Sequence, residues 1–239
     1  MKRLQGRKMQ RYSIIEEKAK REIVLLRGSG CVYKKCTFCD YHLDSCKDES
    51  ANFALNKEVL DKVSGKYGNL EVINSGSVFE LDKATLEYIK KICNEKDIKT
   101  LHFEAHWLYR NRIPALREEF KDFDVKMKLG LETFDYHLRE DILCKGILES
   151  NPQEIARGFD EVNLLFGLSG QNAQSMERDM ELALENFERV CVNIMCDNTT
   201  AVKPNKKVIG EFMQYIYPEY IGDSRVDILV NNTDFGVGE

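Results

Sequence analysis

The sequence has no apolar run of the roughly 18 residues that a membrane-spanning helix needs. Its start carries the basic residues Lys2, Arg3, Arg7, Lys8 and Arg11, but the apolar segment of a signal peptide does not follow. We therefore expect a solvated arm or helix at this end and a cytoplasmic protein. In that reducing compartment the eight cysteines are expected to be thiols, so clustered cysteines become candidates for metal or redox chemistry.

An excess of positive charge is also missing, because the formal net charge is −5. Proteins that bind nucleic acid mainly through backbone phosphates are usually basic, so stable nucleic-acid binding is not expected. A small anionic ligand needs only a local pocket and stays possible. Linkers, low-complexity tracts and short repeats are not evident. A chain of 239 residues can bury one sizeable core, and we expect residues 1–239 to form a single domain.

Short apolar strands alternate with amphipathic helices along the chain. Helix starts are indicated by Asp82 as a cap, by Pro114, and by Asn151 followed by proline and then glutamate. Further helices are expected near 172–187 and 208–217. Alternation of this kind predicts an α/β fold with parallel strands and right-handed crossovers, either an incomplete barrel or a doubly wound sheet. The strands are expected at 23–26, 70–73, 100–103, 125–131, 159–166, 190–195 and 226–230.

Three cysteines follow the first of these strands within a glycine-rich loop, 28–42. Cys31, Cys36 and Cys39 have the spacing C-x4-C-x2-C. Thiolates are the usual ligands of iron–sulfur clusters, and three of them leave the fourth iron of a cubane open to a substrate or cofactor. Gly28 and Gly30 permit the tight backbone that such a loop needs.

Other readings of the cysteine loop remain open at this point. Plant-type ferredoxins share the spacing but need a fourth cysteine, and here the next ones are Cys46, very close, and Cys93, far along the chain. A structural zinc site needs four ligands, and His42 or Cys46 is a possible fourth, so zinc is the main competitor. Three unrelated buried thiols are a further alternative. We expect Cys93, Cys144 and Cys191 to be ordinary thiols.

The loop resembles the cysteine motif of the radical S-adenosylmethionine superfamily, in which three cysteines follow the first strand of a partial (β/α)6 barrel. The commonest spacing there is C-x3-C-x2-C, and this chain has one additional residue between Cys31 and Cys36. The resemblance implies a partial (β/α)6 barrel. It also implies that Cys31, Cys36 and Cys39 hold a 4Fe–4S cluster and that the open iron binds S-adenosyl-L-methionine. The resemblance further implies that an electron from flavodoxin or ferredoxin cleaves this cofactor to a 5′-deoxyadenosyl radical, which abstracts a hydrogen from the substrate.

Other landmarks of the superfamily fall in the expected order. Residues 74–77 resemble the loop that binds the methionine amino group, and Glu104 ends the third strand, where relatives often hold the ribose. Residues 130–133 are similar to a G-x-E-T/S element, and 164–170 to a segment that contacts adenine. Taken alone, such a loop is an ordinary turn and each glutamate an ordinary surface carboxylate. The resemblance implies cofactor-binding roles for Phe38, Tyr41, Ser75, Gly76, Ser77, Glu104, Glu132 and Leu168.

Polar residues at the ends of the later strands are the candidates for substrate binding. They gather at 193–199 and 231–236, where Asx-rich turns are the alternative explanation. Two polar clusters at one end of a barrel suit a ligand rich in hydrogen-bonding groups, such as a purine-like base, whose edge a carboxylate can pair with. The candidates are His106, Asn193, Asp197, Asn232 and Asp234.

The small size, the four-residue spacing and these polar strand ends are together similar to one group within the superfamily, lyases that release the 7-deazaguanine base queuine from queuosine 5′-phosphate. This resemblance implies hydrogen abstraction from the ribose and places Asp197 or Asp234 at the edge of the base. The alternatives are a radical enzyme that modifies tRNA or a peptide, and a non-enzymatic zinc-binding module.

Overall fold

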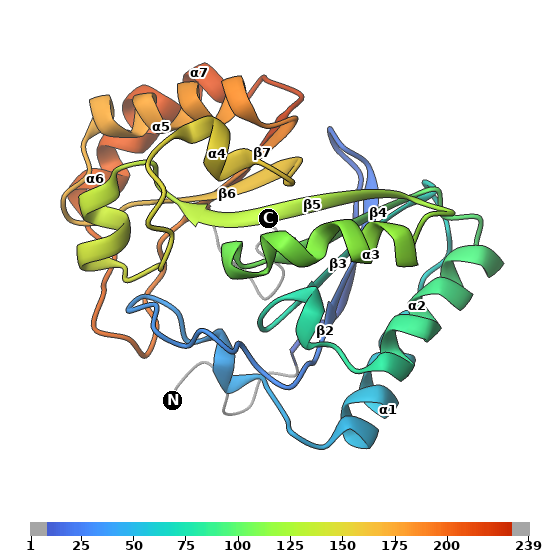
Figure 1. The fold of residues 1–239 in the computed structure, drawn as a ribbon. Helices are drawn as coiled ribbons and strands as arrows, with labels where there is room; N and C mark the ends of the chain where they lie inside the picture. The colour runs from blue at the N-terminus through green and yellow to red at the C-terminus, as the bar shows by residue number, and fades with distance from the viewer. Residues whose placement is uncertain (1–8, 231–239) are drawn as a thin grey trace. The chain divides into compact units, whose positions relative to one another are not determined.

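The structure of the protein is a computed structural model that describes residues 9–230 (Figure 1). Asn232 and Asp234, two of the predicted substrate-binding residues, lie outside this range. Within it, one eight-stranded sheet follows the order of the sequence. The strands are β1 Tyr12–Ile15, β2 Arg21–Leu26, β3 Asn69–Asn74, β4 Thr100–Ala105, β5 Asp124–Glu132, β6 Glu161–Phe166, β7 Arg189–Ile194 and β8 Val226–Leu229.

Strand pairing has the parallel character that the alternating pattern predicts. The pairs β2–β3, β3–β4, β6–β7 and β7–β8 are all parallel. Each connection between these partners passes through a helical segment, as parallel neighbours require. The helices along the chain are α1 Glu49–Leu60, α2 Lys83–Glu95, α3 Ile113–Glu119, α4 Pro152–Ala156, α5 Ala173–Asn186, α6 Lys206–Glu211 and α7 Tyr217–Tyr220.

Two elements were not predicted from the sequence. Strand β1 is only four residues long and pairs with β2 in antiparallel orientation, so it stands outside the repeating strand–helix unit. Helix α1 buries Asn52 and Asn56 together with Val59 and Leu60. Because two of its four buried side chains are amides, the helix shows little of the apolar periodicity by which an amphipathic helix is recognised.

Two of the predicted helix starts are confirmed by capping hydrogen bonds, and the third, at Pro114, by a proline in the first turn of α3 without a side-chain cap. The Asp82 carboxylate accepts a hydrogen bond from the amide of Thr85 at 2.8 Å. The Asn151 side chain accepts one from the amide of Gln153 at 2.9 Å, with proline in the first turn of α4. A side-chain acceptor at this position satisfies one of the amides that the first helical turn leaves without a partner.

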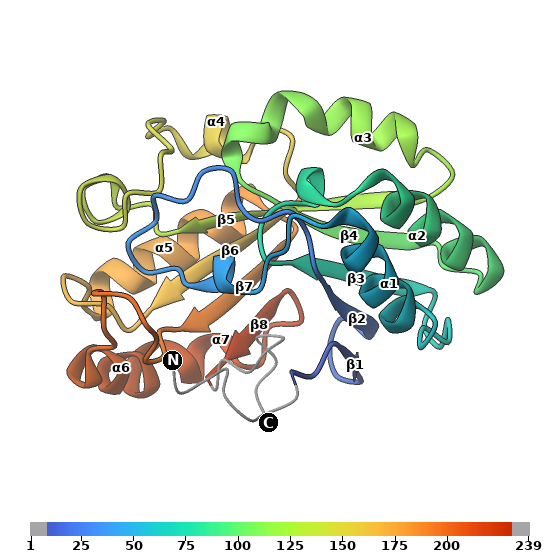
Figure 2. The same ribbon diagram turned by 90° about the horizontal axis from the view of Figure 1, so that it is seen from below.

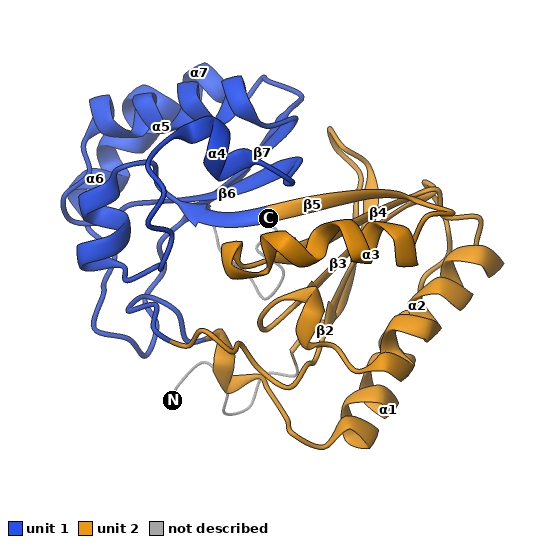
Figure 3. Ribbon diagram, viewed as in Figure 1, with its two compact units in different colours: residues 1–7, 35–40, 129–239 blue, residues 8–34, 41–128 orange. Residues whose placement is uncertain are grey.

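The chain divides into two compact units (Figure 3). Of the described residues, unit 1 comprises 35–40 and 129–230, and unit 2 comprises 9–34 and 41–128. In unit 2, helices α1 and α2 pack against each other, and α1 packs against β2 (Figure 2). In unit 1, α5 packs against β6 and β7. The single-domain expectation for residues 1–239 stays a prediction.

One face of the sheet in unit 2 carries buried polar residues. The strand registers put Glu71 of β3 level with Ile23 of β2 and with His102 of β4. Side chains alternate between the faces of a strand, so Glu104 shares the face of His102. The opposite face carries apolar side chains such as Val72 and Phe103, which are fully buried. Because the apolar face packs against helices, the polar face is the one available for chemistry.

No helix in the described part of the chain is long and apolar enough to cross a membrane.

Candidate functional site

Cys31 belongs to unit 2 and lies half-buried in the loop that follows β2. The preceding residue, Gly30, has φ +95°, a conformation that residues with a side chain rarely adopt. A Cβ atom at Gly30 would also lie 2.9 Å from the Ser45 side chain. The tight backbone expected around the first cysteine is therefore present.

The glycine-rich loop after β3 lies beside the Cys31 loop. A Cβ atom at Gly76 would approach the Cys31 backbone nitrogen to 3.2 Å and the Glu80 carboxylate to 2.0 Å. The Ser77 hydroxyl accepts a hydrogen bond from the amide of His106 at 2.9 Å. Unit 2 therefore brings together the predicted first cluster ligand, two residues of the predicted methionine-binding loop and the predicted substrate residue His106.

Ser75 points to another partner. Its hydroxyl donates to the Asp44 carboxylate at 3.0 Å, and Asp44 in turn forms a salt bridge of 2.5 Å with Arg11. The Ser75 side chain thus binds the segment that follows the cysteines. Its role in cofactor binding stays a prediction.

Glu80 was missed in the sequence, although it is buried at the junction of these two loops. Its carboxylate accepts hydrogen bonds from the amide of Val32 at 2.8 Å, the amide of Ser77 at 2.6 Å and the hydroxyl of Tyr109 at 3.1 Å. Burial, together with the nearby Glu80 charge, raises the pKa of Tyr109 to about 12. A sequence signal was present, because Ser77 and Glu80 have the S-x-x-E spacing of a capping box.

His106 lies against the cysteine loop. Its ring stacks on Tyr33 with the centroids 4.5 Å apart, and its Nδ1 accepts a hydrogen bond from the amide of Leu108 at 3.1 Å. Glu104 is a quarter exposed and lies 3.7 Å from the ammonium of Lys128. Tyr41 begins the short helical turn η1, Tyr41–Leu43, and is half exposed. The cofactor roles of Glu104 and Tyr41 stay predictions.

Cys36 and Cys39 belong to unit 1, in the segment 35–40, and both are half-buried. Hydrogen bonds from distant parts of the chain hold this segment. Thr37 donates its amide to the Leu143 carbonyl at 3.1 Å. The Asn198 side chain donates to the Phe38 carbonyl at 2.6 Å. These contacts fix the backbone between the two cysteines.

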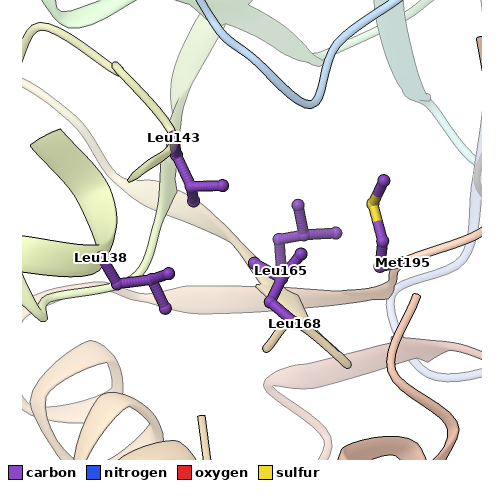
Figure 4. Packing of buried hydrophobic residues seen from close by; sticks show 5 residues of the cluster. All are labelled: Leu138, Leu143, Leu165, Leu168 and Met195. Carbon is purple, nitrogen blue, oxygen red and sulfur yellow. The ribbon is translucent and has the colours of Figure 1, made fainter. Parts of the chain in front are cut away.

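The Phe38 ring packs against an apolar cluster in unit 1, and Leu168 is part of that cluster (Figure 4). Leu168 is almost fully buried, and its amide donates to the Gln171 side chain at 2.9 Å. Two residues with predicted cofactor-binding roles, Phe38 and Leu168, therefore belong to the same apolar region of unit 1. The cluster consists of Leu138, Leu143, Leu165, Leu168 and Met195.

A hollow of about 520 Å³ adjoins this cluster. Leu138, Leu143 and Leu168 form part of its apolar wall, whereas Lys203 and Lys206 line its polar side. A wall of both kinds suits a flat heterocycle that also carries polar groups.

Glu132 and Lys145 form a buried salt bridge of 2.7 Å in unit 1. Glu132 ends β5 with φ +75°, in the left-handed region. The Lys145 ammonium also lies 5.5 Å from the centre of the Phe38 ring. Lys145 was missed in the sequence because it stands in an irregular segment without a local pattern.

The electrostatic surroundings of Lys145 include two of the cysteines. Burial by itself lowers the pKa of this ammonium. The negative charge of Glu132, together with that of Cys36 and Cys39 when these thiols are ionised, outweighs that effect and holds the pKa above its usual value. A fixed buried cation therefore stands near two of the three predicted cluster ligands.

The remaining substrate candidates are placed differently. Asn193 lies on β7, level with Leu165 and Leu229 of the neighbouring strands. Asp197 is largely exposed and forms a salt bridge of 2.9 Å with Lys203, which lowers the pKa of that carboxyl. The structure thus brings Asn193 into the sheet but shows Asp197 as a surface ion pair.

The donor chemistry of the loop fits an iron–sulfur cluster, since three half-buried cysteines outside any disulfide stand at the predicted positions and a cation lies near two of them. Within residues 9–230, no group of three or more His, Cys, Asp or Glu side chains has an arrangement that could hold a metal ion. Metal sites commonly form only when the metal binds. The assignment of Cys31, Cys36 and Cys39 therefore stays a prediction.

Comparison with known proteins decides the family. No family model matches the chain. The solved structure of a queuine lyase from Clostridium spiroforme, bound to S-adenosylmethionine and queuine, superposes with a TM-score of 0.92. The two sequences are 44% identical, and the match covers 97% of this chain and 100% of that one. This chain belongs to the queuine lyase family of radical S-adenosylmethionine enzymes.

More distant matches agree with the queuine lyase family in fold alone. Streptococcus suis SuiB matches with a TM-score of 0.54 and 15% identity over 85% of this chain and 48% of that one. Methylornithine synthase matches with a TM-score of 0.52 and 14% identity, over 82% and 62% of the two chains. The predictions of an α/β partial (β/α)6 barrel of the radical S-adenosylmethionine type, and of an enzyme, are confirmed.

Among curated proteins, this chain matches an uncharacterized protein of Methanocaldococcus jannaschii, with 26% identity over 141 residues. The match spans 52% of this chain but only 38% of that protein. It therefore adds no statement about activity.

Proposed function

We propose that this chain is a radical S-adenosylmethionine lyase that releases queuine from queuosine 5′-phosphate. The observation that carries the proposal is the 44% identity, over 97% of the chain, to a queuine lyase that was solved with S-adenosylmethionine and queuine bound. A fold match alone does not imply a function, but full-length similarity at this identity to a protein with both ligands goes beyond a fold match.

Cys31, Cys36 and Cys39 are proposed to hold a 4Fe–4S cluster through their thiolates. When bound, the cluster supplies the electron that cleaves S-adenosylmethionine to a 5′-deoxyadenosyl radical. The chain itself contributes ligands, orientation and exclusion of water. Flavodoxin or ferredoxin is proposed as the external reductant.

Cofactor-binding roles are proposed for the residues that the resemblance to radical S-adenosylmethionine enzymes implies. In unit 2, Ser75, Gly76 and Ser77 are proposed to bind the methionine amino group through their carbonyls and hydroxyls, which accept hydrogen bonds from an ammonium. In unit 1, Phe38 is only partly buried and is proposed to offer apolar surface for the adenine, whereas the segment of Leu168 is proposed to contact it through its backbone. Glu104, Glu132 and Tyr41 complete the proposed set.

For the substrate, Asn193 of unit 1 and His106 of unit 2 are proposed to contact the base or the ribose. An amide side chain donates and accepts, as the edge of a deazaguanine does. Asp197 is held by Lys203, so it has to leave that salt bridge before it pairs with the base. Asn232 and Asp234 stay in the proposed set on the sequence alone.

A cytoplasmic location is proposed on the basis of the cysteines. All eight lie within the described residues, and none of them forms a disulfide. Extracellular proteins of this cysteine content usually form disulfides.

The decisive experiment incubates the anaerobically reconstituted protein with queuosine 5′-phosphate, S-adenosylmethionine and dithionite, and measures free queuine and 5′-deoxyadenosine. We expect both products from the wild type. Cys36→Ala should lose bound iron and reduce cleavage by at least roughly 100-fold, because each thiolate is a direct ligand. Cys93→Ala is the matched control, since Cys93 is buried and its thiol pKa is raised to about 12 by burial.

Each failure has its own meaning. Cleavage of S-adenosylmethionine without queuine would reject the lyase and favour a radical enzyme acting on tRNA or a peptide. Stoichiometric zinc in place of iron and sulfide would reject the cluster. Equal iron loss in Cys36→Ala and Cys93→Ala would contradict the ligand assignment.

A further inference from the structure

The Glu80 side chain is enclosed by donors from two loops of unit 2. It is 6% exposed. Its Oε1 accepts from the Val32 amide at 2.8 Å and from the Tyr109 hydroxyl at 3.1 Å, and its Oε2 accepts from the Ser77 amide at 2.6 Å. One oxygen thus serves the cysteine loop and the other serves the glycine-rich loop.

The backbone of Glu80 holds the same cysteine loop from its other side. Its carbonyl accepts hydrogen bonds from the amide and the hydroxyl of Ser29, at 3.1 and 3.3 Å. Ser29 precedes Cys31 by two positions and Val32 follows it directly, so the cysteine stands between two anchors of a single residue. Gly76 completes the junction, because a Cβ atom there would lie 2.0 Å from the Glu80 carboxylate.

We propose that Glu80 is a positioning residue that sets the Cys31 thiolate relative to the loop 74–77, and thereby the alignment of S-adenosylmethionine on the cluster. The proposal rests on the proposed function. Glu80 acts through backbone amides and does not touch the substrate. Groups that orient metal ligands in this way typically change metal affinity or activity by roughly 10- to 100-fold when they are replaced.

The role requires a carboxylate rather than any polar group of the same size. An ionised carboxylate only accepts hydrogen bonds, and here three donors converge on it. A glutamine has one oxygen and one NH₂ group. Whichever way that amide turns, its NH₂ group faces a backbone N–H, either of Val32 or of Ser77, and one loop loses its anchor.

Glu22 is a matched control in the same unit. It is fully buried, and its carboxylate accepts from the amides of Ser64 and Gly65, both at 2.7 Å, and from the hydroxyl of Tyr12 at 2.7 Å. These partners lie in the loop after α1 and on β1, not in the cysteine loop. Glu22→Gln therefore breaks the same kind of network without touching the cluster ligands.

The test compares Glu80→Gln, Glu80→Asp and Glu22→Gln after anaerobic reconstitution. The readouts are iron and sulfide per folded chain, the Kd for S-adenosylmethionine, the change that this ligand causes in the electron paramagnetic resonance spectrum of the reduced cluster, and amide hydrogen exchange. We expect Glu80→Gln to weaken S-adenosylmethionine binding about tenfold or more and to speed amide hydrogen exchange at Val32 and Ser77.

Glu80→Asp keeps the carboxylate and should recover part of the affinity. Glu22→Gln should stay within about twofold in both cluster content and Kd, because it touches none of the proposed ligands.

The proposal is overturned if Glu80→Gln retains wild-type cluster content, spectrum and affinity per folded chain, or if Glu22→Gln matches its losses. That failure is distinguishable from failure of the proposed function. A wild-type protein that releases queuine while Glu80→Gln equals it rejects only the role of Glu80. A wild-type protein that binds no cluster rejects both.

Discussion

Lys128 and Lys145 are both buried against a glutamate, Lys128 in unit 2 and Lys145 in unit 1. Lys128 contacts Glu71, whose other oxygen accepts from Arg21, and lies 3.7 Å from Glu104. Four neighbouring strands, β2 to β5, thus contribute two cations and two anions. The group is balanced among its own members, as buried charges usually are when they serve the fold.

Lys145 has a different environment. Its salt-bridge partner is Glu132, but its positive charge also acts on Cys36 and Cys39, which become negative when they lose their protons. The charges of Lys145 and Glu132 therefore cancel only while the two thiols are neutral. When the thiols are ionised, they also interact with the Lys145 ammonium. The comparison teaches that burial of a lysine does not reveal its role, whereas the groups it faces do.

Replacing Lys145 should have the largest effect on chemistry. Lys145→Met leaves the Glu132 carboxylate and two thiolates without their buried cation, which disfavours the ionised cysteines. We expect S-adenosylmethionine cleavage to fall by about 100-fold and the reduction potential of the bound cluster to shift to more negative values, since a nearby positive charge stabilises the reduced form. Potentiometric titration and cleavage assays check this. Unchanged potential and cleavage would remove the distinction between the two lysines.

Replacing Lys128 should mainly cost stability. Lys128→Met removes the ammonium that contacts Glu71 and lies near Glu104, and breaking a buried ion pair from one side typically costs about 3–5 kcal/mol. Urea unfolding measures the loss. Iron content and cleavage per folded molecule should stay near wild type; a loss as large as that of Lys145→Met would contradict the structural reading of this group.

The smallest expected effect concerns a buried acid whose hydrogen bonds come from uncharged donors. Asp179 accepts from the Thr133 hydroxyl and the Phe134 amide, directly after Glu132 in the chain. Burial raises the pKa of Asp179 from 3.8 to about 6. The stability that its protonated form contributes is therefore complete below pH 3.8 and is lost as the pH rises through about 6, a change of roughly 3 kcal/mol at most.

Asp179→Asn should remove this pH dependence. Unfolding free energies of the two proteins, measured from pH 4 to 7, should diverge in that window and run parallel above it. If the two unfolding free energies keep the same difference over the whole pH range, the prediction is wrong. Burial at β5 would then not raise the pKa of Asp179.

The fold was largely readable from the sequence because its strands are apolar runs and its helices begin at recognisable caps. The caps at Asp82 and Asn151 are local signals, and local signals survive in a sequence read alone. Helix α1 was missed because it buries Asn52 and Asn56, which interact with Arg27 and Thr85 rather than forming an apolar stripe.

The candidate site was less readable. The cysteine spacing and the loop 74–77 are local patterns, whereas Lys145 becomes relevant only through a partner 13 residues earlier that the fold brings within 2.7 Å. Glu80 carried a local signal that was not used. Asp197 shows the opposite case, since its position after a strand suggested a binding role and the structure shows an exposed pair with Lys203.

The left-handed backbone of Glu132 has a consequence for protein engineering. A residue with a side chain loses about 1 kcal/mol or more in that conformation, which glycine adopts freely. Glu132→Gly would relax the main chain while it deletes the partner of Lys145, so the two contributions to the melting temperature oppose each other. Selection of a variant library for heat resistance alone would therefore not report the role of Glu132. Directed evolution for thermal stability would tend to lose the carboxylate unless catalytic turnover is measured in the same round.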